Sequence, residues 1–443
     1  MLAAAFVLYP LSVSATDLLS AYRSALENDS TFRAATARYR AALQRLPQAR
    51  AALLPGLSAT AAVNKNHEEV VTESPIFSRP AGRARYTSDE LRLTLTQPLY
   101  NAVAWANLRQ ATAQVRQAEA EFQQAKQDLI LRTAEAYLAV LLAQDTLALA
   151  QSERTALAKN LEVVQGRKAA GFASIIDVND ARARLEATVA QEIEARNALD
   201  DQRQALREMT GTLYEQISRL TEDTMLPRPS PPLPDAWVES AITNNPAVRA
   251  AAEAVEVARE NIAKNRGAHY PVVEAIGSRT YMDAEGSIPG PAVRSGSSVI
   301  GLQVRVALFQ GGAVSAAAEE AVQLHQAAID ELQARRRAAE RAARRAFQGT
   351  ESGAARIAAL REAIAAAESA LAAKLEGRSL GLYTTLDILD STRELYRSKR
   401  EYAEARVAYL RHYLQLKSAA GRLTEDDVIA VNRLLTSDNA STR

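Results

Sequence analysis

Hydrophobic residues recur at every second position in two segments of this chain. The apolar positions are Leu91, Leu93 and Leu95 in the first segment and Ile300, Leu302, Val304, Val306 and Leu308 in the second. Such alternation predicts strands with one apolar and one wet face. A half-exposed strand of a soluble sheet shows the same alternation, but roughly 10 residues is also the length of a tilted transmembrane strand.

A long stretch with a helical pattern follows each of these segments. The stretches from Ala102 to Lys168 and from Ala313 to Glu376 contain no proline. Each predicts a helix on the order of 100 Å long, which is far beyond a globular helix and typical of a coiled coil. Apolar residues at a seven-residue spacing indicate a heptad seam in the helix expected near the C-terminus. They are Ile388, Leu395, Tyr402, Tyr409 and Leu416.

Short breaks punctuate the helical regions. Gly171 and Gly381 follow the two long helical stretches, and Ser174 and Thr384 come three residues later. A glycine at such a place ends a helix, and a serine or threonine can cap the next one. The sequence therefore predicts two helical hairpins, each with its tip about 100 Å from the strands.

The order of these parts occurs twice. Asn28 to Arg33 answers Asn244 to Arg249, and Gly171 to Val178 parallels Gly381 to Ile388. We interpret the chain as two copies of one unit, each with two strands and a polar loop between them, near 67–87 and 283–297. The predicted organisation has five parts. These are a signal peptide at 1–15, a first repeat at 16–226, a proline-rich linker at 227–234, a second repeat at 235–421 and a C-terminal tail at 422–443.

Composition removes several functional classes. The 53 basic and 52 acidic side chains are balanced, which argues against a nucleic-acid partner. The chain has no cysteine, and its histidines share no ligand spacing. They are His67, His269, His325 and His412. With no phosphate loop or nucleophile elbow either, we expect no cofactor, no metal and no enzyme activity.

Three motifs carry a family resemblance that covers about 16–435. They are the segments Gln48 to Pro55, Leu95 to Asn101 with its counterpart Leu308 to Gly312, and Gly381 to Asp390. In this order they resemble the outer-membrane efflux proteins typified by TolC. The resemblance implies a mixed α/β, mostly helical membrane protein. Four strands per subunit would give a twelve-stranded transmembrane barrel in a homotrimer, continued by a helical coiled-coil barrel across the periplasm.

The resemblance also implies location and partners. The protein would lie in outer-membrane lipid and reach into the periplasm. A periplasmic adaptor and an inner-membrane pump, either an ABC transporter or a proton-driven one, would dock at the hairpin tips near Gly171 and Gly381. The cargo would be protein or small molecules. The rival interpretation is a periplasmic coiled-coil adaptor or scaffold, which would share the signal and the hairpins but would not need four strands.

Five residues near the tips match functional positions of that family. Asp387 and Asp390 match paired aspartates that line the narrow entrance, where close like charges should raise some carboxyl pKa values. The plainer alternative is that they complement a helix dipole. Asp177 matches an aspartate that holds the entrance shut. Its two partner positions are exchanged here, with Arg378 in place of the family tyrosine and Tyr383 in place of the family arginine.

Overall fold

The computed structural model describes residues 16–70, 82–221, 226–286 and 292–436. The predicted signal peptide and parts of both polar loops lie outside these ranges. Within them, no helix combines the length and the apolar composition needed to cross a bilayer.

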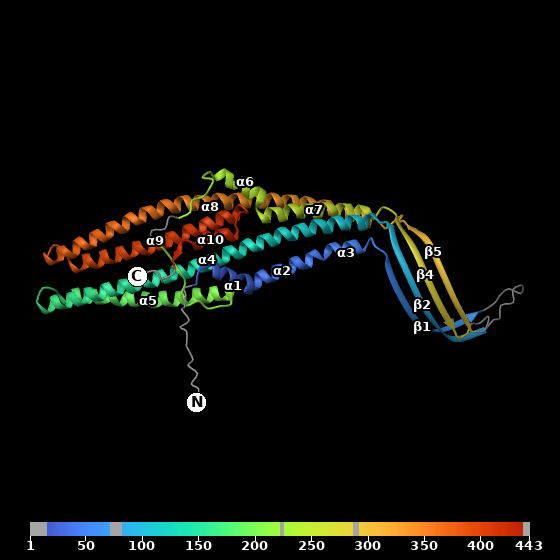
Figure 1. Ribbon diagram of the computed structural model, residues 1–443, viewed down its shortest axis with the longest axis horizontal. Helices are drawn as coiled ribbons and strands as arrows, with labels where there is room; N and C mark the ends of the chain where they lie inside the picture. The colour runs from blue at the N-terminus through green and yellow to red at the C-terminus, as the bar shows by residue number, and fades with distance from the viewer. Residues whose placement is uncertain (1–15, 71–81, 222–225, 287–291, 437–443) are drawn as a thin grey trace, which may run out of the picture. The chain divides into compact units, whose positions relative to one another are not determined.

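The same order of elements occurs in both halves of the chain (Figure 1). The first half comprises α1 (Leu18–Asn28), α2 (Ser30–Leu43), α3 (Arg45–Ala51), β1 (Gly56–Val70), β2 (Gly82–Tyr100), α4 (Ala102–Ala169) and α5 (Ile175–Thr210). The second comprises α6 (Pro234–Asn244), α7 (Pro246–Gly267), β4 (Val272–Ala284), β5 (Val293–Arg305), α8 (Ala313–Ser379) and α9 (Thr385–Ala419). Short elements follow the halves, namely β3 (Arg219–Leu220), α10 (Glu425–Asn432) and β6 (Leu435–Thr436).

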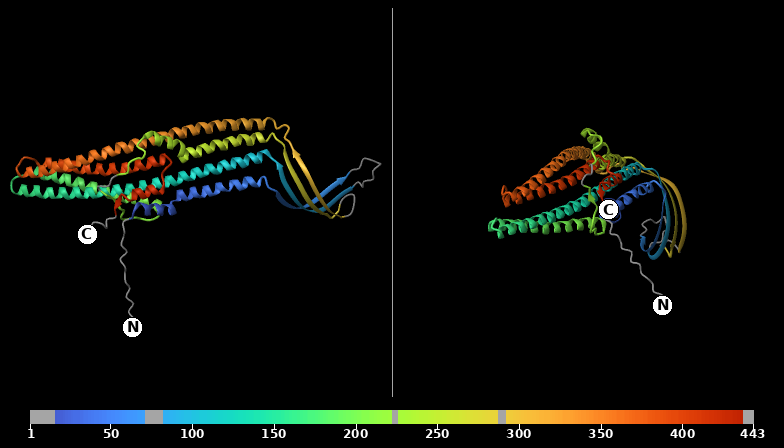
Figure 2. Two further views of the ribbon diagram at one scale, coloured as in Figure 1. Left: turned by 45° about the horizontal axis from the view of Figure 1, so that its top comes forward. Right: turned by 60° about the vertical axis from the view of Figure 1, so that its left-hand side comes forward.

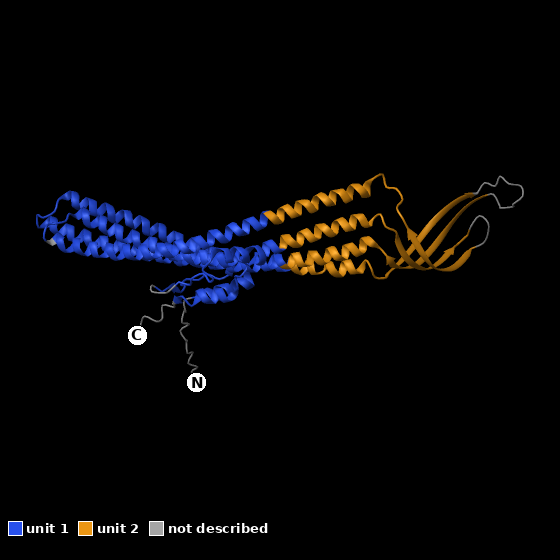
Figure 3. Ribbon diagram, turned by 90° about the horizontal axis from the view of Figure 1, so that it is seen from above, with its two compact units in different colours: residues 1–37, 120–249, 334–443 blue, residues 38–119, 250–333 orange. Residues whose placement is uncertain are grey.

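The chain divides into two compact units, and each unit draws on both halves (Figure 3). One unit comprises 1–37, 120–249 and 334–443, and the other comprises 38–119 and 250–333. The unit that contains the hairpin tips is called the tip unit below, and the other is called the sheet unit. The two long helices α4 and α8 each contribute residues to both units.

The sheet unit holds a four-stranded antiparallel sheet in the order β1-β2-β4-β5. Directly paired residues lie on the same face. The register Leu57↔Leu95, Leu95↔Gly277 and Gly277↔Ile300 therefore places the apolar positions of three strands on one face, called the apolar face below. This face is bare in the single chain, where Ile300 is 93% exposed.

The end of β5 differs from the sequence-based prediction. Val306 and Leu308 were expected to extend the alternation, but β5 ends at Arg305. The last pair of the ladder is Val272↔Arg305, and the residue before Val272 is Pro271. Proline has no N–H to donate, so the ladder lacks a donor beyond this pair.

The tip unit is built around the two hairpins α4–α5 and α8–α9, which lie side by side (Figure 2). Arg400 of α9 joins them through an ion pair of 2.7 Å with Glu153 of α4. The hydrophobic core takes residues from α4, α5 and α9. They include Leu129, Tyr137, Leu138 and Leu141 of α4, Leu199 and Leu206 of α5, and Tyr409, Leu410 and Leu414 of α9.

The predicted heptad seam is confirmed. Ile388, Leu395, Tyr409 and Leu416 are buried, and Tyr402 is half-buried. Within the predicted C-terminal tail, residues 425–432 form α10. Thr424 and Asp427 make a capping box there, and Val428 and Val431 are buried.

Candidate functional site: the hairpin tips

The first tip joins α4 to α5 through a turn closed by backbone hydrogen bonds. Gly171 has φ +82°, a conformation that costs glycine little. Its N–H donates to the Lys168 carbonyl (3.0 Å), and the Phe172 N–H donates to the Arg167 carbonyl (2.8 Å). This Schellman pattern satisfies carbonyls that the end of α4 leaves free.

A capping box then starts α5. The Asp177 carboxylate accepts hydrogen bonds from the backbone N–H (2.8 Å) and the hydroxyl (2.7 Å) of Ser174. Ser174 Oγ in turn accepts a hydrogen bond from the Asp177 N–H (3.1 Å). The bonds from Ser174 hold the pKa of Asp177 below its usual value of 3.8, and the guanidinium of Arg167 also lowers it.

The second tip repeats this geometry between α8 and α9. Gly381 has φ +76°, and its N–H donates to the Arg378 carbonyl (3.1 Å). The Asp387 carboxylate accepts from the Thr384 N–H (2.8 Å) and hydroxyl (2.6 Å). These bonds, the hydroxyl bond foremost, lower the pKa of Asp387. Both predicted caps, at Ser174 and Thr384, are therefore confirmed.

Asp387 and Asp390, the two aspartates that match entrance positions of the family, have different surroundings. Asp387 belongs to the cap. Asp390 lies one turn further along α9 and forms an ion pair of 3.1 Å with Arg184 of α5. Lys374 of α8 donates a hydrogen bond of 2.8 Å to the Ser391 hydroxyl and also lowers the pKa of Asp387. Basic side chains thus accompany both carboxylates within one chain.

Arg378 connects the two hairpins. Its Nη1 donates a 2.6 Å hydrogen bond to Oδ1 of Asn160 in α4, and its carbonyl accepts a 3.3 Å bond from Nη1 of Arg167. Burial, followed by the positive charge of Arg167, lowers the pKa of Arg378. Among the described side chains, Asp177 and Arg378 share no ion pair or hydrogen bond within one chain. A latch, meaning a contact between these residues that holds the entrance shut, therefore stays a prediction.

Tyr383 packs against the last turn of α8. A Cβ added at Gly377 would lie 2.8 Å from Cδ2 of the Tyr383 ring, so a larger residue there would force the ring to shift. Asn160, Arg167 and Arg184 take part in these contacts but were not predicted from the sequence. One feature of the sequence could have pointed to Asn160, because a polar residue on the buried side of a coiled-coil helix needs a hydrogen-bond partner.

Large apolar side chains are exposed at both tips. In the first tip they are Phe172, Ile175 and Ile176, and in the second they are Leu380, Leu382 and Leu386. Single exposed apolar residues are ordinary, but a cluster at the ends of two adjacent hairpins is typical of a contact surface.

Comparison with known proteins identifies the family. A family model described as "Outer membrane efflux protein" matches residues 21–212 and 237–422. The chain belongs to the outer membrane efflux protein family. Its two matched segments fall in the two halves that share one order of elements.

Relatives span nearly the whole chain. Outer membrane protein TolC of Vibrio cholerae is 31% identical over 426 residues, which cover 95% of this chain and 94% of that protein. Proteases secretion protein PrtF of Dickeya chrysanthemi is 31% identical over 429 residues, covering 94% and 91%. The crystal structure of the outer membrane protein VceC from Vibrio cholerae has the same fold, with a TM-score of 0.79, 20% identity, and 91% and 96% covered.

These matches establish the class of protein. The chain is an outer-membrane channel protein for secretion or efflux, with a periplasmic extension. The mostly helical fold with an antiparallel sheet agrees with the sequence-based prediction. The rival interpretation as a periplasmic adaptor finds no support among these relatives.

Proposed function

We propose that three copies of this chain assemble into one passive channel. The observation that carries the proposal is the pair of open sheet edges. In the sheet order β1-β2-β4-β5, the outer edges of β1 and β5 pair with no other described strand of the chain. A closed transmembrane barrel needs at least about eight strands. Edge pairing of β5 with β1 of the next copy gives twelve strands from three copies and leaves no open edge.

The register supports a membrane position for this barrel. The apolar face, with Leu57, Leu95 and Ile300, suits acyl chains. The opposite face carries the intervening polar residues Thr94, Thr96 and Ser278, which suit a wet lumen.

The hairpin tips then form the periplasmic entrance. Asp387 and Asp390 of three copies make two rings of carboxylates that attract cations. Mutual repulsion within such rings raises carboxyl pKa values, opposite to the lowering that the cap causes at Asp387 in one chain. Arg184 offsets part of the charge at Asp390.

Contacts centred on Arg378 hold the entrance closed. Within a chain, Arg378 already bonds Asn160 across the two hairpins. We place Asp177 and Tyr383 in the same latch, with Asp177 facing Arg378 across neighbouring hairpins in the assembled entrance.

The partners dock at the tips. A periplasmic adaptor contacts the exposed apolar side chains beside Gly171 and Gly381, such as Phe172 and Leu382. The adaptor links the channel to an inner-membrane pump, either an ABC transporter or a proton-driven one. The pump selects the cargo, protein or small molecule, and supplies the energy, so the channel itself needs no catalytic residue and no cofactor.

Planar-bilayer recordings of the purified protein test this function. The parent should form cation-preferring channels that multivalent cations block. Replacement of both Asp387 and Asp390 by Ala should leave assembly intact but weaken cation preference and block. A double variant that is as selective and as readily blocked as the parent would remove these aspartates from the entrance.

A further inference from the structure

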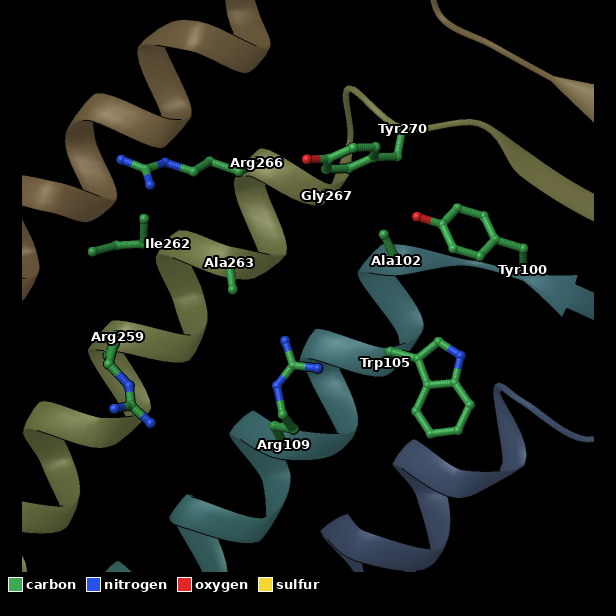
Figure 4. A pocket seen from close by; sticks show the side chains of 10 residues that line it. All are labelled: Tyr100, Ala102, Trp105, Arg109, Arg259, Ile262, Ala263, Arg266, Gly267 and Tyr270. Carbon is green, nitrogen blue, oxygen red and sulfur yellow. The ribbon is translucent and has the colours of Figure 1, made fainter.

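A groove of about 680 Å³ lies in the sheet unit, where β2 leads into α4 and α7 ends (Figure 4). Three aromatic and three basic side chains line it. They are Tyr100, Trp105, Tyr270, Arg109, Arg259 and Arg266. Tyr100, Trp105 and Tyr270 are each about half exposed, which is unusual for so many large rings in one place. Figure 4 shows Arg109 on α4 and Arg259 on α7, on facing helices.

The groove continues the apolar face of the sheet. Tyr100 pairs with Val273, and Val273 pairs with Val304. Val304 lies two residues along from Leu302 and four from Ile300, so Tyr100 shares the apolar face with them. Both adjoining strands, β2 and β4, are central in the sheet. A copy that pairs at either sheet edge therefore leaves the groove uncovered.

The charges in and beside the groove do not cancel. Arg109 uses Nε to contact Glu260 at 2.8 Å, and Arg259 contacts Glu256 at 2.6 Å and Glu260 at 3.5 Å. Within the described ranges, Arg266 has no carboxylate partner and the two Nη atoms of Arg109 make no hydrogen bond. Three guanidinium groups against two carboxylates leave one net positive charge and unused donors.

These features match the chemistry of a phospholipid headgroup. Tyr and Trp rings favour the boundary between acyl chains and water. Guanidinium donors bind phosphate oxygens with a matching planar geometry. A lipid with one net negative charge balances the site, whereas the ammonium group of phosphatidylethanolamine brings a second positive charge to it.

We propose that this groove binds the headgroup of an anionic phospholipid in the periplasmic leaflet of the outer membrane. Arg266 and the free Nη atoms of Arg109 hold the phosphate, and the three rings lie against the glycerol and the start of the acyl chains. The inference rests on the outer-membrane position of the sheet and is independent of the cargo and of the gate. The bound lipid would fix the depth at which the strands meet the helices.

Quenching of Trp105 fluorescence by brominated lipids tests the proposal. The chain has two tryptophans, and the other, Trp237, is only 1% exposed. The protein is reconstituted in vesicles that contain equal mole fractions of brominated phosphatidylglycerol or brominated phosphatidylethanolamine. Brominated phosphatidylglycerol should quench more strongly, because its binding constant should be on the order of fivefold higher than that of brominated phosphatidylethanolamine. The Trp105→Phe variant should lose the difference between the two lipids.

Matched arginine variants separate the site from general surface charge. In Arg266→Gln, the ratio of the binding constants for phosphatidylglycerol and phosphatidylethanolamine should fall close to one. Arg266→Lys should retain most of the preference for phosphatidylglycerol. Arg116→Gln is the control, because Arg116 lies further along α4, outside the groove, and pairs with Glu253 at 2.8 Å. This control should keep the preference of the parent.

Three results would overturn the proposal. The first is equal quenching by the two lipids in the parent protein. The second is an equal loss of preference in Arg266→Gln and Arg116→Gln, which would indicate a diffuse charge effect. The third is loss of the preference on addition of excess inorganic phosphate, which would make the groove a site for free phosphate. Native mass measurement of each variant confirms that its assembly is unchanged.

Discussion

The guanidinium of Arg184 lies 3.1 Å from the carboxylate of Asp390, and this ion pair joins α5 of one hairpin to α9 of the other. Both side chains are partly exposed, at 36% and 56%, so the pair itself adds little to stability. Its consequence is electrostatic. Each copy of the chain brings a positive charge next to one of the two carboxylates that we place at the entrance.

Removal of that positive charge should make the channel more selective. We predict that Arg184→Gln raises the cation preference in reversal-potential measurements, and that Arg184→Gln combined with Asp390→Asn returns it close to the parent value. Arg182→Gln is the matched control, because Arg182 is exposed two residues away, on the opposite side of α5. Equal effects of the two arginine changes would contradict a specific role for Arg184.

The capping boxes should determine the local stability of the tips. We predict that Ser174→Ala or Thr384→Ala destabilises its tip by about 1 kcal/mol, because an N-cap hydrogen bond is lost. Protease cleavage at the altered tip should then be on the order of fivefold faster. Ser152→Ala is the control, since the Ser152 hydroxyl bonds the Ala148 carbonyl within α4 and caps nothing. Unchanged cleavage in both cap variants would contradict the assignment.

The same caps predict a pH dependence. The pKa values of Asp177 and Asp387 are lowered from 3.8 by the bonds from Ser174 and Thr384. A lowered pKa means that the stabilisation is present above about pH 4 and is lost as the pH falls through the lowered values. We therefore compare hydrogen-exchange protection at the tips of the parent and of the double variant Asp177→Ala/Asp387→Ala. The difference in protection between the two proteins should be the same at pH 7 and at pH 5. A difference that shrinks already above pH 5 would show that repulsion within the assembled rings outweighs the caps.

Local features of the tips could be predicted from the sequence because they depend on residues close in the chain. Gly171, Ser174 and their counterparts Gly381 and Thr384 specify a helix end and a helix start within a few residues. The alternation in β2 likewise specifies its apolar face, since the strand period is fixed by backbone geometry.

Contacts between the hairpins could not be predicted in the same way. Asn160 and Arg378 are 218 positions apart, and Arg184 and Asp390 are 206 apart. Their pairing depends on the rotation and stagger of four long helices, which a heptad pattern does not specify. The same applies to the groove at the end of β2, whose lining residues come together only when β2, α4 and α7 are placed against one another.

The latch should respond to changes at Arg378. We predict that Arg378→Ser or Asp177→Ala raises single-channel conductance, because charge-assisted bonds at a partly buried site contribute roughly 1.5–3 kcal/mol to the closed state. The two changes together should do little more than either alone, since both remove one interaction. Tyr383→Phe should have a smaller effect.

A variant of Asn160 tests the contact of Arg378 within one chain separately from its proposed contact with Asp177 of a neighbouring chain. If the hydrogen bond from Arg378 to Asn160 orients the guanidinium, Asn160→Ala should also raise conductance and should add nothing to Arg378→Ser. Additive gains from Asp177→Ala and Arg378→Ser would mean that these two residues act separately. Parental conductance in all of these variants would mean that another contact closes the entrance.

The mass of the native protein in detergent decides whether three copies form the channel, because a sheet with two open edges in each chain can close into a barrel only by assembly. We expect a single complex with three times the mass of the mature chain and a mostly helical circular dichroism spectrum. A stable monomer or dimer in mild detergent would contradict the pooling of four strands from each of three copies.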